Sequence, residues 1–440
     1  MPPFSPADNP TLFEMLSCIS TAMDLVSPMV VCHQKRTGFI AWSLGREMGL
    51  PSRELMSLLL GGMLHDCGAL ETPGKLEALR FDFDRDNPHE HAEAGYAFLK
   101  SFEESFPEMS GLDLAGLVRH HHVSWNQGRG QEFHGRPVSP LSHLLHLADR
   151  VEVLLRRDSA ILEQAPEVSA RIQNLAGSLF APEMVEAFRG LASRESFWLD
   201  LGFSEGLNQL LTEAASNAPV VSLDLDGMLR LTAVFAQMVD FRSRYTAIHS
   251  SSVARTAGCL AAKAGFSKAD QMRISIAGNL HDLGKLAVPT QILEKPGPLT
   301  PSEFNVIKAH PHQAFRLLSP LRRLGDVVDW VAFHHETLDG AGYPFHVKAD
   351  DLSLGARILA AADIFTALTE DRPYRNGMPL EQTLGILKSQ VQAGKLDALV
   401  VSLIEKHQEE VCQVCTGGHD ARVLEYLDFQ TMVRQDSLAG

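Results

Sequence analysis

The chain of 440 residues contains few cysteines and no long apolar run. Without a stretch of about 18 consecutive apolar residues, no membrane-spanning helix is expected. The opening Met1-Pro2-Pro3-Phe4 lacks the basic stretch and apolar core of a targeting peptide. Six cysteines in a chain of this length indicate a reducing compartment rather than a disulfide framework. We therefore expect a cytoplasmic protein that does not span a membrane.

Positive charge is also scarce. The chain has 39 Lys and Arg residues against 54 Asp and Glu residues, which gives a net charge of −15. Proteins that bind nucleic-acid polymers do so through a basic surface that contacts the phosphates, so no such partner is expected. A small phosphate substrate is still compatible with this composition, because it needs only a few cations or metal ions close to it.

Aromatic residues make up only 7% of the chain, and the β-branched and aromatic runs typical of strands are rare. Apolar residues instead recur at spacings of three and four, as in Leu55, Leu58, Leu59 and Met63, which predicts amphipathic helices. A chain of this length suits two domains of roughly 200 residues each. The sequence therefore predicts an all-α protein with two domains.

The two halves of the sequence share a pattern of histidines and aspartates. Residues 32–70 align with residues 248–286 without a gap, and in each segment a histidine precedes a His-Asp pair by 32 residues. Three more matches follow in order: His91 with His310, His121-His122 with His334-His335, and Asp149 with Asp363. This order predicts two copies of one helical domain, with two unrelated helical bundles as the alternative.

The predicted boundaries follow from this duplication. The first domain covers residues 1–200, a linker covers 201–225, the second domain covers 226–425, and a C-terminal tail covers 426–440. The linker is placed where Gly202, Gly206 and Pro219 interrupt the helical pattern.

The second copy contains more metal-ligating residues than a single ion needs. They are His249, His281, Asp282, His310, His334, His335 and Asp363. Histidine and carboxylate ligands suit divalent transition metals. The set fits two ions that share the Asp282 carboxylate, one completed by His310, His334 and His335 and the other by His249, His281 and Asp363. A lone buried histidine is usually a core residue, but an adjacent pair whose partners recur in the other half favours a metal centre.

Two metal ions about 3.5–4 Å apart lower the pKa of a bridging water and stabilise an in-line displacement at phosphorus. Cationic residues lie close to the ligands in the sequence. Lys285 comes four residues after His281, one helical turn on if the helix continues, and Arg372 and Arg375 follow Asp363. Without the nearby ligands, the two arginines would be interpreted as solvated surface charges.

A short loop follows His334-His335-Glu336. It reads Asp339-Gly340-Ala341-Gly342-Tyr343-Pro344, and its glycines and proline predict a sharp turn that presents Tyr343 near the metals. Taken alone, such a segment indicates only a turn.

These motifs in this order resemble the HD-GYP family, a branch of the HD phosphohydrolase superfamily. The resemblance covers roughly residues 231–411 and includes His281-Asp282-Leu283-Gly284-Lys285, His310-Pro311, the loop through Pro344, and Asp371-Arg372-Pro373-Tyr374-Arg375. It implies an all-helical fold, a centre of two or three metal ions, and hydrolysis of cyclic di-GMP or a related cyclic dinucleotide such as 3'3'-cyclic GMP-AMP. The product would be the linear dinucleotide or mononucleotides.

The resemblance also implies roles for individual residues. The seven histidines and aspartates of the second copy would bind metal, with Asp282 and Lys285 taking part in catalysis. Lys285, Arg372 and Arg375 would contact substrate phosphate, and Gly342, Tyr343 and Pro344 would lie beside the substrate.

The sequence departs from the family pattern at three positions. Ala314 stands where the family usually has a glycine, Thr366 where an aspartate often occurs, and Tyr245 where a glutamate would precede His249 by one turn. We therefore expect two metal ions rather than three, with iron and manganese as the best candidates for such ligands.

The first copy keeps a full ligand set but lacks the cations. Its candidate metal ligands are His33, His65, Asp66, His91, His121, His122 and Asp149. Ala69 occupies the position that matches Lys285, and no Arg-Pro-Tyr-Arg segment follows Asp149. This copy resembles a general HD domain, and we interpret it as a regulatory or scaffolding domain that can still bind metal. A second active site of different specificity is the rival interpretation.

Two other functions stay open for the whole chain. One is an HD phosphohydrolase that acts on another nucleotide or an alarmone, which the Gly-Tyr-Pro loop disfavours. The other is a non-catalytic cyclic-dinucleotide receptor, which the complete ligand set disfavours. The expected partner is a cyclic dinucleotide substrate, with a second copy of the chain or a signalling protein as further candidates.

Overall fold

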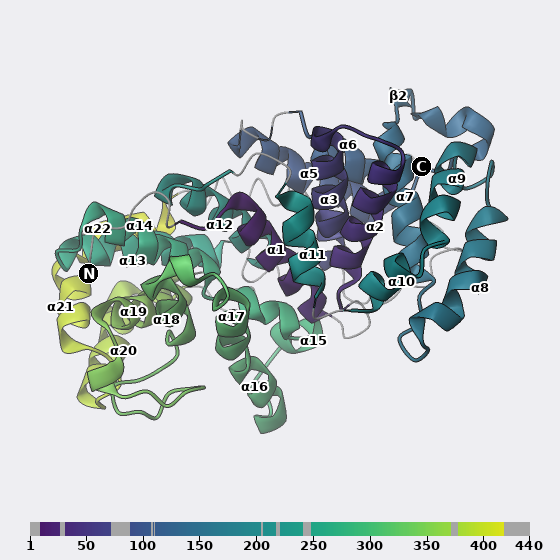
Figure 1. The fold of residues 1–440 in the computed structure, drawn as a ribbon. Coiled ribbons are helices and arrows are strands. Elements are labelled where there is room, and N and C mark those ends of the chain that lie inside the picture. The colour runs from purple at the N-terminus through teal and green to yellow at the C-terminus, as the bar shows by residue number, and fades with distance from the viewer. Residues whose placement is uncertain are drawn as a thin grey trace. The chain divides into compact units, whose positions relative to one another are not determined.

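The computed structural model describes residues 9–26, 31–71, 89–106, 109, 111–203, 206–216, 221–240, 248–370 and 377–417. The regular secondary structure of these residues is almost entirely helical (Figure 1). The only strands in the described ranges are a short antiparallel pair, β1 (Glu132–Phe133) and β2 (Arg136–Pro137). The all-α prediction is therefore confirmed. None of the helices described is at once long enough and apolar enough to cross a bilayer.

The chain divides into two compact units. The division falls between Cys18 and Ile19, within α1 (Leu12–Met23), and again between Val221 and Ser222. We call the unit that begins at Ile19 the N-terminal unit and the unit that contains Ser222–Thr416 the C-terminal unit. The segment predicted as a linker, 201–225, contains the helix α11 (Leu207–Ala215), which packs against α2 and α3 of the N-terminal unit.

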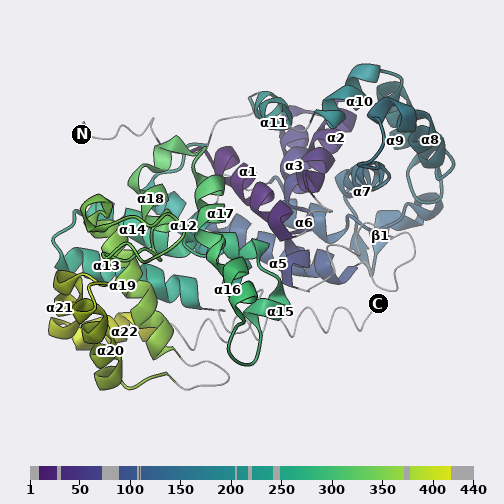
Figure 2. The ribbon, with the colours of Figure 1, turned by 90° about the horizontal axis from the view of Figure 1, so that it is seen from below.

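The N-terminal unit is built around three helices, α2 (His33–Glu47), α3 (Ser52–Leu64) and α7 (Pro140–Val153), which pack on one another. Further helices surround them: α5 (His89–Ser105), α6 (Leu114–Arg119), α8 (Ile161–Gln173), α9 (Pro182–Ala192) and α10 (Glu195–Gly202). Figure 2 shows α8, α9 and α10 grouped together within this unit. Short 3₁₀ turns complete it: η2 (Asp24–Val26), η4 (Cys67–Glu71) and η6 (Asn126–Gln131).

The C-terminal unit repeats this arrangement with α13 (His249–Lys263), α14 (Lys268–Leu280) and α19 (Leu354–Thr369) in its centre. Its other helices are α12 (Leu225–Asp240), α15 (Thr290–Leu293), α16 (Pro301–Lys308), α17 (His310–Leu318), α18 (Asp326–Ala332), α20 (Leu380–Gln392), α21 (Ala398–Lys406) and α22 (Gln408–Thr416). Its 3₁₀ turns are η7 (Leu283–Ala287), η8 (Arg322–Leu324) and η9 (Ala349–Asp351).

The matched motifs occupy the same structural positions in both units. A histidine begins α2 and α13, a His-Asp pair follows α3 and α14, and an aspartate lies on α7 and α19. This correspondence of elements and motifs agrees with a duplicated helical domain.

Candidate metal centres and active site

The C-terminal unit brings all seven predicted ligands of the second copy together. Most of them lie at helix ends: His249 begins α13, His281 and Asp282 follow α14, His310 begins α17, and His334 and His335 follow α18. Asp363 lies on α19. All seven are buried except His335, whose side chain is 24% exposed. His335 is therefore the ligand through which this centre reaches solvent.

Three of the histidine rings are oriented by their own backbone. The Nδ1 atoms of His281, His310 and His334 each hydrogen-bond the carbonyl oxygen three residues earlier, at 2.7 Å in every case. A ring that donates through Nδ1 carries its lone pair on Nε2. The Nε2 atoms of all three rings point into the same centre, where the pairs His281–His334 and His310–His334 have ring centroids 5.0 and 5.2 Å apart.

The Asp282 carboxylate lies between two groups of ligands. Its Oδ2 is 3.3 Å from His281 Nε2 and its Oδ1 is 3.4 Å from His310 Nε2. Ligands held at about 2.0–2.2 Å from one ion are separated from each other by roughly 3–3.5 Å. Each carboxylate oxygen is thus at ligand spacing from a different histidine, as a bridge between two ions requires.

The side chains gather in the two groups expected from the sequence, and His281, Asp282 and His334 also cluster across them, so the split stays a prediction. In one, the Nε2 of His249 lies 3.1 Å from Asp363 Oδ1, and the Nε2 of His281 lies 3.9 Å from the same oxygen. In the other, His310 and His334 approach through their Nε2 atoms at 3.2 Å, and His335 lies close to both. These spacings are compatible with a carboxylate shared by two cations, and the number of ions stays a prediction.

Burial and nearby charges set the protonation states in which these histidines and Asp282 can bind a cation. Burial lowers the pKa of His310 and of His335 to about 3, so both rings are neutral and able to donate a lone pair. Burial opposes ionisation of Asp282, but His281 and Lys285 hold the pKa of its carboxyl well below the usual range. Within the described residues, His281 Nε2 and Asp282 Oδ1 are buried without a hydrogen-bond partner. Such atoms are costly to leave unpaired, and a divalent cation would satisfy both.

Lys285 reaches the centre by a different path from the expected helical turn. The helix α14 ends at Leu280, and the 3₁₀ turn η7 carries Lys285 to within 2.6 Å of Asp282 Oδ2. Gly284 makes this turn compatible with α17, because a Cβ there would lie 2.0 Å from the His310 carbonyl oxygen. Gly68 has the same role in the first copy, where a Cβ would lie 2.2 Å from the His91 carbonyl oxygen.

The Gly-Tyr-Pro loop lies beside the metal ligands. The Tyr343 ring is 4.8 Å from the His335 ring, Gly342 is buried, and the peptide bond between Tyr343 and Pro344 is cis. Burial, together with the Asp363 and Asp282 charges, raises the pKa of Tyr343, so its phenol stays neutral. The loop therefore places an uncharged aromatic group next to His335, the partly exposed candidate ligand.

Glu336 fixes this loop through its side chain. Its carboxylate accepts hydrogen bonds from the backbone N–H groups of Phe345, His346 and Val347 at 2.7, 3.0 and 3.2 Å, and the residue is only 4% exposed. The sequence placed Glu336 in the motif but did not predict this function.

Loss of the Glu336 carboxylate is expected to loosen the loop. Each charge-assisted hydrogen bond contributes about 1.5–3 kcal/mol. Glu336→Ala is therefore expected to lower kcat/KM for cyclic-dinucleotide hydrolysis at least about tenfold, with metal content retained. Steady-state kinetics and metal analysis of the same sample test this, and Glu336→Gln, which keeps one acceptor oxygen, is expected to be milder. Unchanged kinetics in Glu336→Ala would show that the loop does not depend on this carboxylate.

Glu370 is a further site residue that the sequence did not reveal. It accepts a hydrogen bond from His249 Nδ1 at 2.9 Å and raises the pKa of that ring well above its ordinary value, against the effect of burial. Glu370 follows Asp363 by seven residues and lies immediately after the last residue of α19, and this spacing was the available signal. Arg372 and Arg375, predicted to contact phosphate, lie outside the described residues.

The N-terminal unit brings together the seven matching residues of the first copy. His33 Nε2 lies 3.3 Å from Asp66 Oδ2 and 3.4 Å from Asp149 Oδ1, and His65 Nε2 lies 3.2 and 3.5 Å from the same two oxygens. These separations are again those of ligands around one ion. His65 Nε2 is buried with no hydrogen-bond partner among the described residues, like its counterpart His281.

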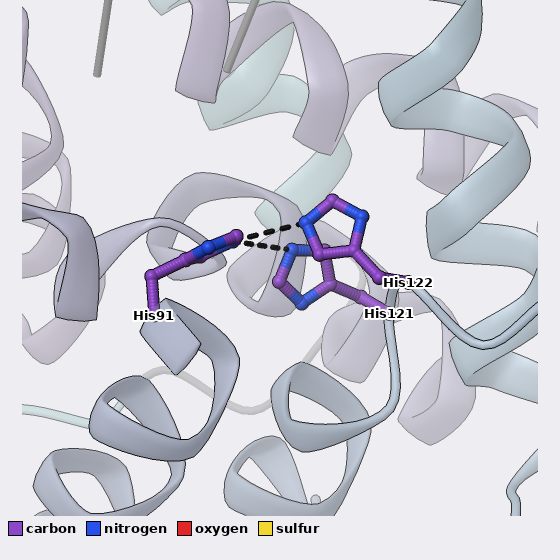
Figure 3. Close-up of side chains that lie close together, drawn as sticks. All are labelled: His91, His121 and His122. Carbon is purple, nitrogen blue, oxygen red and sulfur yellow. Dashed lines mark hydrogen bonds between the residues drawn. The ribbon is translucent and has the colours of Figure 1, made fainter. Parts of the chain in front are cut away.

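The remaining ligands of this unit form a histidine cluster, shown in Figure 3. His91 Nε2 lies 3.4 Å from His121 Nε2 and 3.0 Å from His122 Nε2, and 3.4 Å from Asp66 Oδ1. Asp66 therefore stands between two ligand groups as Asp282 does. His122, unlike His335, is buried.

Different side chains contact the carboxylates in the two centres. Gln34 donates to Asp66 Oδ2 at 3.0 Å, where Lys285 pairs with Asp282, and the matching Ala69 is buried. Arg150 donates to Asp149 Oδ2 at 2.5 Å. In the first copy Arg150 contacts Asp149, the counterpart of Asp363, whereas Lys285 in the second copy contacts Asp282.

Comparison with known proteins agrees with this geometry. One HD domain model matches residues 30–154 and a second HD domain model matches residues 233–400. Each match spans one of the two centres. The chain therefore contains two HD domains, one in each unit.

Two relatives in Vibrio cholerae match almost the whole HD-domain chain. The 3'3'-cGAMP-specific phosphodiesterase 1 is 29% identical over 92% of this chain and 94% of its own length. The 3'3'-cGAMP-specific phosphodiesterase 3 is 28% identical over 86% of this chain and 90% of its own length. A cyclic di-GMP phosphodiesterase of Thermotoga maritima is 34% identical over 43% of this chain and 52% of its own length. These matches confirm the resemblance to the HD-GYP phosphodiesterases.

A solved structure shares the fold of the HD-domain chain. The crystal structure of a cyclic GMP-AMP specific phosphodiesterase from Vibrio cholerae superimposes with a TM-score of 0.62 at 22% identity, covering 91% of this chain and 98% of that one. At this identity the likeness establishes the common fold.

Proposed function

We propose that the C-terminal HD domain is a metal-dependent phosphodiesterase that hydrolyses a cyclic dinucleotide. The observation that carries this proposal is the Asp282 carboxylate, which lies between two groups of metal ligands with Lys285 beside it and Tyr343 at the exposed ligand. The two relatives matched over at least 90% of their length are 3'3'-cGAMP-specific phosphodiesterases, which supports the same reaction.

The seven side chains from His249 to Asp363 would hold the metal ions. When bound, two divalent ions supply a water of lowered pKa and charge stabilisation at phosphorus. The protein's own contribution is to position the substrate. Tyr343 offers a neutral aromatic surface next to His335, and burial of the other ligands limits access to that side.

Lys285 is proposed to contact a non-bridging phosphate oxygen. Its ammonium group is 2.6 Å from Asp282 and the side chain is 22% exposed, so it can serve both the carboxylate and an incoming phosphate. A charge-assisted hydrogen bond made to the substrate stabilises the charge that develops during displacement.

Replacement of Lys285 tests this role. Lys285→Ala is expected to lower kcat/KM about 10²-fold while metal content is retained, because the ligands themselves are unchanged. Parallel kinetics and metal analysis make the distinction, with Lys285→Arg as the variant that keeps the charge. Loss of metal in Lys285→Ala would assign this residue to the metal centre rather than to the substrate.

We propose 3'3'-cyclic GMP-AMP as the preferred substrate over cyclic di-GMP. Both relatives that match more than four-fifths of this chain are 3'3'-cGAMP-specific, whereas the cyclic di-GMP phosphodiesterase of Thermotoga maritima matches less than half of it. Discrimination between the two substrates depends on hydrogen bonds to the edge of one base. The product would be the linear dinucleotide or mononucleotides.

The proposed function is tested with metal-free protein reloaded with ferrous iron or manganese, the two ions proposed for this site. Each preparation is given 3'3'-cyclic GMP-AMP, cyclic di-GMP and cyclic di-AMP, and the products are separated by chromatography. Hydrolysis of 3'3'-cyclic GMP-AMP with the highest kcat/KM is expected. Failure to cleave any of the three with either metal would contradict the proposal.

The N-terminal HD domain is proposed to bind metal without hydrolysing a cyclic dinucleotide, and to act as a regulatory or scaffolding domain. Its ligand spacings support metal binding. Its buried His122 and the neutral Gln34 at Asp66 argue against a phosphate substrate there. Water activation without a counterpart of Lys285 to hold phosphate in line is insufficient for this reaction.

A further inference from the structure

We propose that Phe304 and Lys308 of α16 form, with Tyr343, a substrate platform at the catalytic centre. On this platform Phe304 stacks on a base of the cyclic dinucleotide, and Lys308 contacts the phosphate that is not being cleaved. The proposal rests on the proposed function, and it adds two residues to which no role in the reaction has been given above.

The helix α16 is unusual because none of its residues is buried. Phe304 is 41% exposed, although a phenyl ring is usually stabilised by burial. Thr300 and Glu303 form a capping box at the start of the helix, and Lys295 pairs with Glu303 at 2.6 Å. Capping and ion pairing thus fix the start of a helix that buries no side chain of its own.

The exposed ring continues an aromatic row that starts at a metal ligand. Tyr343 lies 4.8 Å from His335 at an interplanar angle of 36°, and Phe304 lies 6.0 Å from Tyr343 at 80°. The row therefore runs from His335, the partly exposed ligand, to Phe304 at the surface. Figure 1 shows α16 next to α17, the helix that begins at the ligand His310.

Lys308 supplies positive charge along this row. Its Nζ is 5.0 Å from the centroid of Phe304 and 5.8 Å from that of Tyr343, within the range of cation–π interactions. It also precedes the ligand His310 by two residues. The ammonium group is thus held over the aromatic surface beside the metal ligands.

The chemistry of this row matches a cyclic dinucleotide better than a simple phosphate ester. Such a substrate has two bases and two phosphates, and only one phosphate reaches the metal ions in a given hydrolytic step. The rest of the molecule must lie outward, where Phe304 offers a face for stacking and Lys308 a charge for the second phosphate. Aromatic side chains bind bases in this manner in many single-strand binding proteins.

The test compares four full-length variants: Phe304→Ala, Phe304→Trp, Lys308→Met and Lys308→Arg. The matched control is Val306→Ala, because Val306 is an apolar residue of the same helix that is exposed to a similar extent, at 37%. The probes are 3'3'-cyclic GMP-AMP and bis(4-nitrophenyl) phosphate, a diester that has neither a base nor a second phosphate. Metal content is measured for every protein.

Phe304→Ala is expected to raise KM for the cyclic dinucleotide about 10- to 100-fold, the range of a lost base–aromatic stack. Lys308→Met is expected to raise it about tenfold. Phe304→Trp, Lys308→Arg and Val306→Ala should stay near wild type. Cleavage of the small diester and metal content should be unchanged in all five.

Two results would overturn the platform. One is a KM in Phe304→Ala equal to that of Val306→Ala, and the other is an equal loss on both diesters, which would indicate general damage to the centre. If wild-type protein itself cleaves no cyclic dinucleotide, the proposed function fails before the platform is tested.

Discussion

Asp282→Ala is expected to abolish hydrolysis of the cyclic dinucleotide, with a loss of at least about 10³-fold in kcat. Asp282 Oδ2 lies 3.3 Å from His281 Nε2 and Oδ1 lies 3.4 Å from His310 Nε2, so each ligand group loses one carboxylate oxygen when the side chain is removed. A binuclear centre stabilises both oxygens of the displacement, and that contribution disappears with the bridge. Turnover and metal content should be measured on the same sample.

The control for this prediction is Asp282→Asn, which keeps the shape but not the charge. Both variants should keep the helical circular dichroism of the wild type, and both should lose metal from the C-terminal centre. Wild-type turnover in Asp282→Ala would contradict the assignment of this carboxylate as the bridge. Loss of helicity would instead show that the variant fails to fold, and Asp282→Asn then decides.

Asp66→Ala is expected to lose metal from the N-terminal centre but, unlike Asp282→Ala, to keep its turnover within about threefold of wild type. Asp66 lies between His65 and His91 at 3.2 and 3.4 Å, so it is the matching shared carboxylate. Metal present at a hundredfold excess over its Kd stabilises a fold by about 2.7 kcal/mol. Loss of the bound metal is therefore expected to lower the Tm of the N-terminal domain by roughly 5–10 °C.

Calorimetry with and without chelator separates the metal contribution from the substitution itself. Wild-type protein should lose about as much Tm on chelation as Asp66→Ala loses in the presence of metal. Asp66→Asn serves as the variant of matched size. Abolition of turnover in Asp66→Ala with the fold preserved would make the N-terminal centre a catalytic requirement and overturn the proposed division between the domains.

The sequence predicted the ligand sets because the chemistry repeats at nearly constant spacing. In both halves a histidine and a His-Asp pair that begins 32 residues later lie at equivalent helix ends, and close packing of α2 on α3 and of α13 on α14 brings them together. The all-helical fold was predicted from the recurrence of apolar residues at spacings of three and four. Composition and spacing were sufficient for these features because each depends on local pattern or on the duplication.

Side chains that support the ligands could not be predicted in this way. Glu152 accepts from His33 three residues after Asp149, whereas Glu370 accepts from His249 seven residues after Asp363. Glu152 lies on α7, whereas Glu370 lies immediately after the end of α19, so the contact is kept although its place in the sequence changes. The partners of the two matching carboxylates were equally unpredictable. Gln34 of α2 contacts Asp66, whereas Lys285 of η7 contacts Asp282, so the two partners come from different elements.

The most direct test of the central claim is the turnover of 3'3'-cyclic GMP-AMP by the full-length protein as metal is removed and returned. Wild type and Asp66→Ala should both lose activity with chelator and recover it with manganese or ferrous iron, whereas Asp282→Ala should stay inactive throughout. Hydrolysis that persists in metal-free wild type, or that returns in reloaded Asp282→Ala, would contradict a metal-dependent phosphodiesterase centred on Asp282.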